Sequence, residues 1–286
     1  METLYLVIPC YNEEDMLPIT SKALLKKMNE LISGGMISPE SKVMFVDDGS
    51  KDKTWELIQV LHDYDPMFTG LKLSRNKGHQ NALLAGLMTA KDYADIIISM
   101  DADLQDDINA IDGFLEKRAE GCDIVYGVRS SRETDTAFKR GTAEAYYKIL
   151  AKMGVEITYN HADYRLMSKR AVEGLAEFKE VNLFLRGLVP MVGYKSGVVK
   201  YRRAERQAGE SKYPLKKMLA FAMEGITSLS VKPIRFITSL GLGGVVLALA
   251  AQDTASNLFS GIVILFDKPF AVGDWISVAG MEGVVE

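Results

Sequence analysis

Cysteine and histidine are scarce in this chain of 286 residues, which has two cysteines and three histidines. Cys10 and Cys122 do not form a CxxC pair, so two buried thiols in a reducing compartment are expected. His62, His79 and His161 lack the spacing of metal ligands, and we expect a structural role for each. The net charge of −4 gives no general attraction to nucleic acid, so no nucleic-acid partner is expected.

The chain also lacks a leader-like segment and a long apolar run. Met1-Glu2-Thr3 leads directly into a strand-like segment, with no basic or apolar region before it, so we expect no signal peptide. Residues 236–251 carry no charge, and residues 258–266 form a second apolar run. Each run falls short of the roughly 20 residues that a membrane-spanning helix needs.

Three short acidic segments each follow a strand-like run: residues 9–14 (PCYNEE), 46–50 (VDDGS) and 100–105 (MDADLQ). Ligands bind beyond the carboxyl ends of strands in an open α/β sheet, so the three segments predict one pocket for metal and phosphate. Asp101 and Asp103 flank one small residue, which places both carboxylates on the same side of an extended chain. Such paired oxygen donors suit Mg²⁺ or Mn²⁺. A solvated turn is the alternative for Asp-Ala-Asp taken alone, and the two other segments argue against it.

Strand-like and helix-like segments alternate over residues 3–130. Strands are expected at 4–9, 42–46, 70–73, 95–100 and 123–126, and helices at about 15–33, 54–63, 79–90 and 108–120. This alternation predicts βαβ units and an α/β fold with a mainly parallel, Rossmann-like sheet. Residues 129–140 are expected to form a loop over the pocket, and residues 141–153 and 168–178 to be helical.

A basic stretch follows at residues 195–217, with eight lysines and arginines against two glutamates. Residues 213–229 then place apolar side chains at helical spacing, at Leu215, Met218, Leu219, Ala222 and Ile226. A basic stretch beside an amphipathic helix predicts binding to a membrane surface, worth about 1 kcal/mol per cation near anionic lipid. The alternative is a solvated run of charges beside a helix that packs on the core.

With these segments the chain resembles the family-two glycosyltransferases of the GT-A fold, from about Leu4 to about Arg235. It is most similar to the polyprenyl-phosphate glycosyltransferases, which include dolichol-phosphate mannose synthase and the bactoprenol glucosyltransferases. Further motifs that carry the resemblance are residues 75–78 (RNKG), 126–129 (YGVR), 163–166 (DYRL), 184–187 (FLRG) and 206–213 (RQAGESKY).

The resemblance implies a metal-dependent, inverting transfer of a hexose to undecaprenyl (polyprenyl) phosphate. The donor would be a nucleotide diphosphate sugar, UDP-glucose in first place. The catalytic domain would face the cytoplasm at the cell membrane, with the lipid bilayer as a further partner.

The resemblance also assigns roles within the acidic segments. Pro9, Tyr11 and Glu13 would surround the nucleotide base and ribose, where a carboxylate can accept hydrogen bonds from hydroxyl groups. Asp47 and Asp48 would touch the base and the ribose side, with Ser50 nearby, and Lys77 and Arg75 could meet phosphate. Asp103 and Gln105 would be direct ligands of Mg²⁺ or Mn²⁺, with Asp101 beside them to position the sugar or a metal-bound water.

A lipid phosphate is already anionic, so positioning and charge stabilisation are expected to dominate catalysis. Arg129, Arg140 and Arg206 are candidates for holding the acceptor phosphate and the donor diphosphate, because a guanidinium group matches phosphate oxygens. The family often has a small hydroxyl residue one turn after the second arginine. Thr142 and Glu144 stand near that position here, so the chain departs from the pattern.

The motif at 163–166 leaves two interpretations open. Asp163 and Arg165 could form a structural ion pair at the floor of the pocket, or they could contact the substrate.

The C-terminal segment departs from the transferase family, whose members usually continue into two long transmembrane helices. Residues 243–252 (GGVVLALAAQ) instead resemble the pore-lining helix of a small-conductance mechanosensitive channel, and residues 257–275 resemble the start of its β-domain. We therefore predict a mosaic joined near 239–241, with a transferase domain at 1–212, an amphipathic helix at 213–235 and a membrane segment with the start of a β-module at 236–286. An engineered fusion and a divergent native membrane hairpin are both open. The Gly/Ala pattern predicts close helix packing and a homo-oligomer, with a tetramer favoured.

Two other functions are considered. Processive polysaccharide synthases carry a Gln-x-x-Arg-Trp motif, and the two tryptophans of this chain, Trp55 and Trp275, exclude it from the catalytic region. The second is an oligomerising membrane scaffold or channel-like fusion with an inert transferase domain. The truncated channel module argues against conduction but not against assembly.

Overall fold

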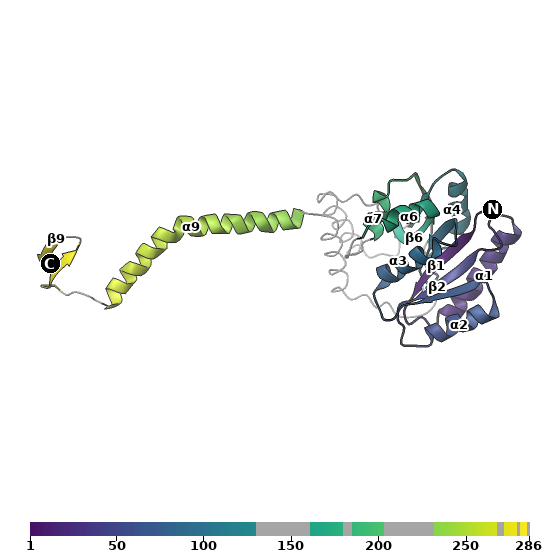
Figure 1. Cartoon of the computed structure of the whole chain (residues 1–286), viewed down its shortest axis with the longest axis horizontal. Helices are drawn as coiled ribbons and strands as arrows, with labels where there is room; N and C mark the ends of the chain where they lie inside the picture. Colours follow the sequence, from purple (N-terminus) through teal and green to yellow (C-terminus); the bar gives the residue numbers. More distant parts are fainter. Residues whose placement is uncertain (130–160, 180–184, 203–231, 268–271, 279–280, 285–286) are drawn as a thin grey trace. The chain divides into compact units, whose positions relative to one another are not determined.

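The computed structural model describes residues 1–129, 161–179, 185–202, 232–267, 272–278 and 281–284. The chain divides into two compact units, Met1–Ser230 and Val231–Glu286. Within the first unit, seven strands form one sheet in the order β3-β2-β1-β4-β6-β5-β7, and Figure 1 labels β1, β2 and β6 among them. The strands are β1 (Leu4–Cys10), β2 (Lys42–Asp47), β3 (Phe68–Lys72), β4 (Ile96–Ser99), β5 (Ile124–Arg129), β6 (His161–Ser168) and β7 (Ser196–Tyr201).

The sheet is mainly parallel, as the sequence predicts, because β3, β2, β1 and β4 pair in parallel and β7 pairs in parallel with β5. The exception is β6, which lies antiparallel between β4 and β5. The sequence analysis predicted neither β6 nor β7. The alternation of β6 is concealed by buried Asp163 and Arg165, which a hydrophobicity pattern assigns to the surface.

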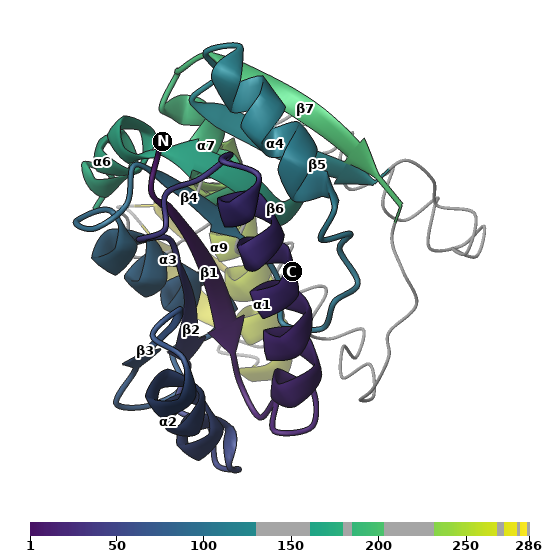
Figure 2. The ribbon, with the colours of Figure 1, turned by 90° about the vertical axis from the view of Figure 1, so that its right-hand side faces the viewer.

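Helices cover both faces of this sheet. They are α1 (Leu17–Ser33), α2 (Thr54–Tyr64), α3 (His79–Ala90), α4 (Ala110–Ala119), α6 (Lys169–Ala176) and α7 (Leu185–Met191). Side chains of α1, α2 and α4 pack with Leu4, Leu6 and Ile8 of β1, whereas α3, α6 and α7 pack with Tyr5 and Val7 on the opposite face. Figure 2 shows α1 and α3 on either side of β1. Both faces are buried, which explains why β1 reads as a continuous apolar run.

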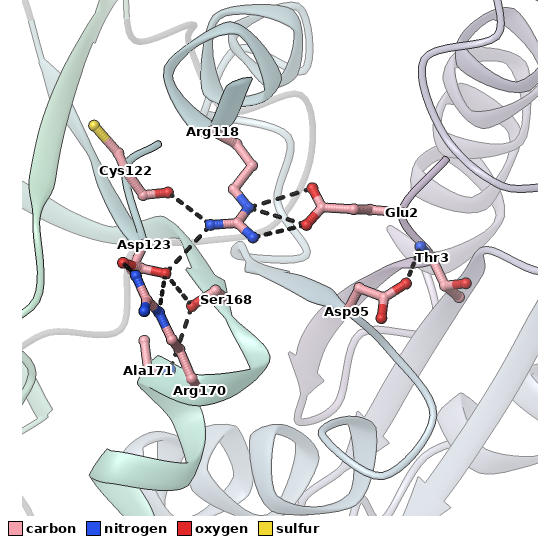
Figure 3. A network of polar contacts seen from close by, with 9 residues as sticks. All are labelled: Glu2, Thr3, Asp95, Arg118, Cys122, Asp123, Ser168, Arg170 and Ala171. Atoms are coloured by element: carbon pink, nitrogen blue, oxygen red, sulfur yellow. Dashed lines mark hydrogen bonds and ion pairs between the residues drawn. The ribbon is translucent and has the colours of Figure 1, made fainter. Parts of the chain in front are cut away.

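A polar network closes the edge of the sheet at which the parallel strands begin (Figure 3). Arg118 of α4 donates to Glu2 over 2.8 Å and to Asp123 over 3.2 Å, and Arg170 forms an ion pair with the same Asp123. Ser168 also donates to Asp123. The ion pair with Arg170 lowers the pKa of Asp123 against the effect of desolvation. This network fastens the start of the chain to α4, β5 and α6, at the edge opposite the acidic segments.

The second unit contains one helix and one hairpin. The helix α9 (Lys232–Asp267) includes both apolar runs of the tail in 36 residues, and β8 (Trp275–Val278) pairs antiparallel with β9 (Met281–Val284). Within the described segments, no helix combines the length and the apolar character needed to cross a membrane. The helices expected at 141–153 and 213–229 lie outside the described residues, whereas α6 confirms the helix expected near 168–178.

Candidate active site

The three acidic segments meet at one edge of the sheet because β1, β2 and β4 are parallel neighbours. The first two segments are joined directly, since the Asp48 N–H donates to the Cys10 carbonyl over 2.9 Å. The third is tied to α1, because the Thr20 hydroxyl donates to the Ala102 carbonyl over 2.6 Å. The edge predicted from the sequence as a ligand site therefore forms from segments about 50 residues apart.

The loops after β1 and β2 are connected by backbone-to-side-chain hydrogen bonds. The Asn12 N–H donates to the Ser50 hydroxyl over 3.0 Å, and the Glu13 N–H donates to the Thr54 hydroxyl over 2.9 Å. Pro9 is buried within β1, Glu13 is half-buried and Tyr11 is exposed. The residues assigned to the base and ribose therefore stand on a fixed pair of loops rather than on independent ones.

The two aspartates after β2 have different surroundings. Asp48 accepts from the backbone N–H groups of Lys77 and Gly78 over 2.7 and 2.9 Å, so its carboxylate holds the loop before α3 in place. Asp47 is fully buried; one carboxylate oxygen accepts from the Ser50 N–H, and the other has no partner in the described part of the chain. Asp47 is thus better suited than Asp48 to receive a hydrogen bond from a ligand.

A glycine is required in the turn after Asp48. Gly49 has a φ of +68°, and a Cβ there would lie 2.5 Å from the carbonyl carbon of Arg75. The turn and the loop at 75–78 are therefore in direct backbone contact. Arg75 and Lys77 are both exposed beside this contact.

The Asp101–Gln105 segment follows β4. Asp103 is buried and accepts from the Gln105 N–H over 3.1 Å, while Asp101 is partly exposed. Leu104, between Asp103 and Gln105, has a φ of +53°. This left-handed conformation costs a non-glycine residue of order 1–3 kcal/mol and is concentrated at functional sites. Burial and the nearby carboxylates of Asp106 and Asp163 raise the pKa of Asp101 against the opposing effect of His79.

These residues fit a divalent cation. A cation would offset the desolvation and the repulsion from nearby carboxylates that raise the pKa of Asp101, and the carboxylates of Asp101 and Asp103 with the Gln105 amide are hard oxygen donors. No group of three histidine, cysteine, aspartate or glutamate residues gathers at metal-binding distance among the residues described.

A second charged cluster, which the sequence analysis resolved only in part, adjoins Asp101. Asp163 is buried on β6 and forms ion pairs with Arg165 over 2.5 Å and with Arg186 of α7 over 3.0 Å. Burial opposes the ionisation of Asp163, but Arg186, His79 and Arg165 together hold its pKa well below the usual value. The structural ion pair is therefore present, and it belongs to a larger network.

His79, for which a structural role was expected, connects the two clusters. Its Nε2 lies 3.7 Å from a carboxylate oxygen of Asp101 and 3.7 Å from one of Asp163. Burial lowers the pKa of His79, but the neighbouring carboxylates of Asp163 and Asp101 outweigh it, so the pKa is raised. The only hint in the sequence is that His79 follows the RNKG motif at the start of α3, beyond a strand end.

The raised pKa of His79 predicts a pH-dependent contribution to stability. The protonated form is favoured in the folded state, so its contribution is fully present below about pH 6.5 and is lost as pH rises through the raised pKa. We expect His79→Gln in the metal-free protein to be destabilised relative to wild type by about 0.5 kcal/mol more at pH 6 than at pH 9, a size typical of partly exposed pairs. Urea denaturation at both pH values measures this difference. An equal loss at both pH values for His79→Gln would contradict the assignment.

Of the three arginines proposed for the acceptor, the structure describes one. Arg129 ends β5, and its Nη2 lies 3.5 Å from a carboxylate oxygen of buried Asp106, three residues after Asp103. Arg140 and Arg206 lie outside the described residues. The described arginine is thus held beside the proposed metal-binding segment through Asp106.

The family model for glycosyl transferase family 2 matches residues 5–175. This chain belongs to that family. An uncharacterized glycosyltransferase of Bacillus subtilis (YkoT) is 57% identical to the chain, covering 83% of it and 71% of the relative. The prophage bactoprenol glucosyl transferase homolog of Escherichia coli is 42% identical over 83% of this chain and 75% of the relative. The protein is therefore a glycosyltransferase.

The fold is shared with solved glycosyltransferases. A crystal structure of GalNAc-T7 with UDP, GalNAc and Mn²⁺ aligns with a TM-score of 0.52 at 14% identity, covering 75% of this chain and 45% of that chain. At this identity the likeness concerns the fold alone, and it supports the GT-A-like α/β architecture.

The C-terminal segment at 236–286, called the tail below, gives a separate match. The family model for the β-domain of mechanosensitive ion channels matches residues 253–286. An uncharacterized glycosyltransferase of Synechocystis is 37% identical over 282 residues, covering 98% of this chain and 86% of the relative. A relative from a natural source thus aligns across the join expected at 239–241.

Proposed function

We propose that this glycosyltransferase moves a hexose, glucose in first place, from a UDP-sugar to polyprenyl phosphate with inversion at the anomeric carbon. The observation that carries the proposal is the placing of Asp101 and Asp103 at the end of β4 beside Arg129 at the end of β5, with Asp106 between them. A site of this kind offers carboxylates for a cation on the donor diphosphate and a guanidinium for a second phosphate. The resemblance to bactoprenol glucosyl transferases supports the choice of acceptor.

In the proposed reaction an oxygen of the acceptor phosphate attacks the anomeric carbon of the sugar. The bond from that carbon to the diphosphate oxygen breaks, and UDP leaves with the electron pair. The acceptor oxygen is already ionised, so no general base is required, and orientation and charge stabilisation supply most of the rate enhancement. A bound divalent cation would neutralise charge on the leaving diphosphate.

The residues of this chain would then have distinct tasks. Asp101, Asp103 and Gln105 would hold the cation, and Arg129 would hold the acceptor phosphate. His79 would keep Asp101 oriented through its contacts with Asp101 and Asp163. Asp47, whose second oxygen is buried without a partner among the described residues, would accept a hydrogen bond from the nucleotide.

The tail supports a proposal that the enzyme works at the cytoplasmic face of the cell membrane as a homo-oligomer. Apolar side chains on several sides of α9 are exposed, including Ile237, Leu240, Leu242, Val245, Val246, Leu247 and Leu249. A helix that is apolar all round requires cover from lipid or from other helices. The match of residues 253–286 to a channel β-domain supports a role in assembly.

The test uses the full chain in detergent–lipid micelles, dialysed against a chelator. We expect transfer of labelled glucose from UDP-glucose to undecaprenyl phosphate only after Mg²⁺ or Mn²⁺ is restored, and slower transfer from UDP-N-acetylglucosamine, UDP-galactose or GDP-mannose. Absence of transfer from all four donors would favour the inert-scaffold alternative. Full activity after chelation would refute the metal requirement.

A further inference from the structure

The hydroxyl group of Tyr201 joins Arg129 to the acidic segment after β4. Tyr201 is the last residue of β7 and is 4% exposed. Its hydroxyl donates to a carboxylate oxygen of Asp106 over 2.6 Å, and Tyr201 stands directly opposite Arg129 in the register of β5 and β7. Asp106, itself 3% exposed, therefore receives both the tyrosine hydroxyl and the guanidinium, the latter at 3.5 Å.

This arrangement constrains the Arg129 side chain from two directions. A tyrosine hydroxyl can donate one hydrogen bond and accept others, so Tyr201 can serve Asp106 as a donor and Arg129 as an acceptor at the same time. Burial and the charge of Asp106 raise the pKa of Tyr201, which keeps the hydroxyl protonated and able to donate. A guanidinium held by two fixed partners loses less freedom when it binds a phosphate.

We propose that Tyr201 is a positioning residue for acceptor binding, which orients Arg129 toward the lipid phosphate through the shared carboxylate of Asp106. The inference rests on the proposed function, in which Arg129 contacts the acceptor. It concerns a residue on the edge strand of the sheet that lies outside the motifs by which the chain resembles a glycosyltransferase. Without the hydroxyl, Arg129 would keep its ion pair with Asp106, but the Asp106 carboxylate would lose the hydrogen bond that fixes its direction.

The same aromatic cluster contains a matched control. Tyr164 packs edge-on against Tyr201 with ring centroids 5.3 Å apart, and its hydroxyl donates to the Asp107 carbonyl over 3.0 Å. Both hydroxyl groups thus hold neighbouring residues of one loop. Of the two, the Tyr201 hydroxyl is the one that meets the same Asp106 oxygen as Arg129.

Steady-state kinetics of the full chain, with the two substrates varied separately, test the proposal. We expect Tyr201→Phe to raise the KM for undecaprenyl phosphate about tenfold, the size of one hydrogen bond to a charged group, and to change the KM for the donor less than about twofold. Tyr164→Phe should change both constants less than about twofold. In an Arg129→Ala background, Tyr201→Phe should have no further effect on acceptor KM.

The outcomes separate the inference from the function on which it rests. If Arg129→Ala raises acceptor KM but Tyr201→Phe behaves like Tyr164→Phe, or still acts in the Arg129→Ala background, the positioning role is overturned alone. If Arg129→Ala leaves acceptor KM unchanged, Arg129 has no acceptor role and both proposals fail. A donor KM that rises in parallel with acceptor KM would show that Tyr201 acts on the whole loop, which also overturns the inference.

Discussion

Asp103→Asn is expected to reduce glycosyl transfer by about 10²–10³-fold while leaving the fold intact, an effect of the size seen when one group that stabilises a charged transition state is removed. The substitution keeps the shape of the side chain, and an asparagine oxygen can still accept from the Gln105 N–H as Asp103 does at 3.1 Å. It removes one negative charge from the segment proposed to hold the cation. The expected loss therefore reports on charge rather than on the turn.

Asp107→Asn is the matched control for this experiment. The Asp107 carboxylate accepts from the Asn109 N–H over 2.9 Å, which repeats the turn at Asp103 four residues further along the chain. We expect Asp107→Asn to retain activity within about threefold. Both variants should unfold within about 1 kcal/mol of wild type, because an asparagine oxygen can still accept the hydrogen bond of each turn. Near-normal turnover of Asp103→Asn at saturating Mn²⁺ would contradict the assignment of Asp103 as a ligand.

The parallel half of the sheet could be predicted from the sequence because its central strands, β1 and β4, are nearly continuous apolar runs. Leu4–Cys10 and Ile96–Ser99 are buried at every position, and each ends at a charged segment that marks the edge of the sheet. Because each acidic segment follows a strand, the three segments then predicted a single ligand-binding site at that edge of the sheet. A short stretch of sequence was sufficient here. Burial on both faces appears as a run of apolar residues, and the end of the strand appears as the charged residues that follow it.

The antiparallel half and its polar network could not be predicted in the same way. Asp163 and Arg165 on β6 are buried charges, so the strand lacks the alternation on which sequence interpretation depends. His79, Asp163 and Arg186 come from α3, β6 and α7, and their contacts exist only after β6 inserts between β4 and β5. Tyr201 meets Arg129 for the same reason, since β7 pairs with β5 after a long separation in the chain.

The network around Asp163 also explains why the site can hold so many like charges. Asp101, Asp103, Asp106 and Asp163 lie near one another, as their effects on the pKa of Asp101 show. Arg129 offsets Asp106, and Arg165 and Arg186 offset Asp163. Asp101 is left partly exposed with His79 as its described partner, which is the arrangement expected of a carboxylate that receives a cation.

Asp163→Ala is expected to produce the largest loss of stability, about 3–5 kcal/mol, because it leaves a buried cation without its counter-ion. Arg165 is 2% exposed, and its Nε and Nη1 already lack acceptors within the described structure. Loss of Asp163 would remove the partner of Nη2 as well. Arg186, which is partly exposed, can turn toward water, so Arg165 accounts for most of the cost.

The measurement is urea denaturation at pH 7 in a Trp275→Phe background, where Trp55 is the one remaining tryptophan and reports on the first unit. Asp95→Ala is the control, because its exposed carboxylate accepts from the Thr3 N–H over 2.8 Å and its loss should cost at most about 1 kcal/mol. Asp163→Leu combined with Arg165→Met should recover at least half of the stability lost in Asp163→Leu alone, since replacing both members of a buried pair avoids the unpaired charge. A double variant less stable than the single one would show that Arg165 does not depend on Asp163.

Because the pKa of Asp163 is held well below its usual value, its contribution is present above about pH 3.9 and is lost only as pH falls through the lowered pKa. The gap between wild type and Asp163→Ala should accordingly not narrow from pH 7 to pH 5, and a gap that closes over this interval would place the charge of Asp163 outside the network.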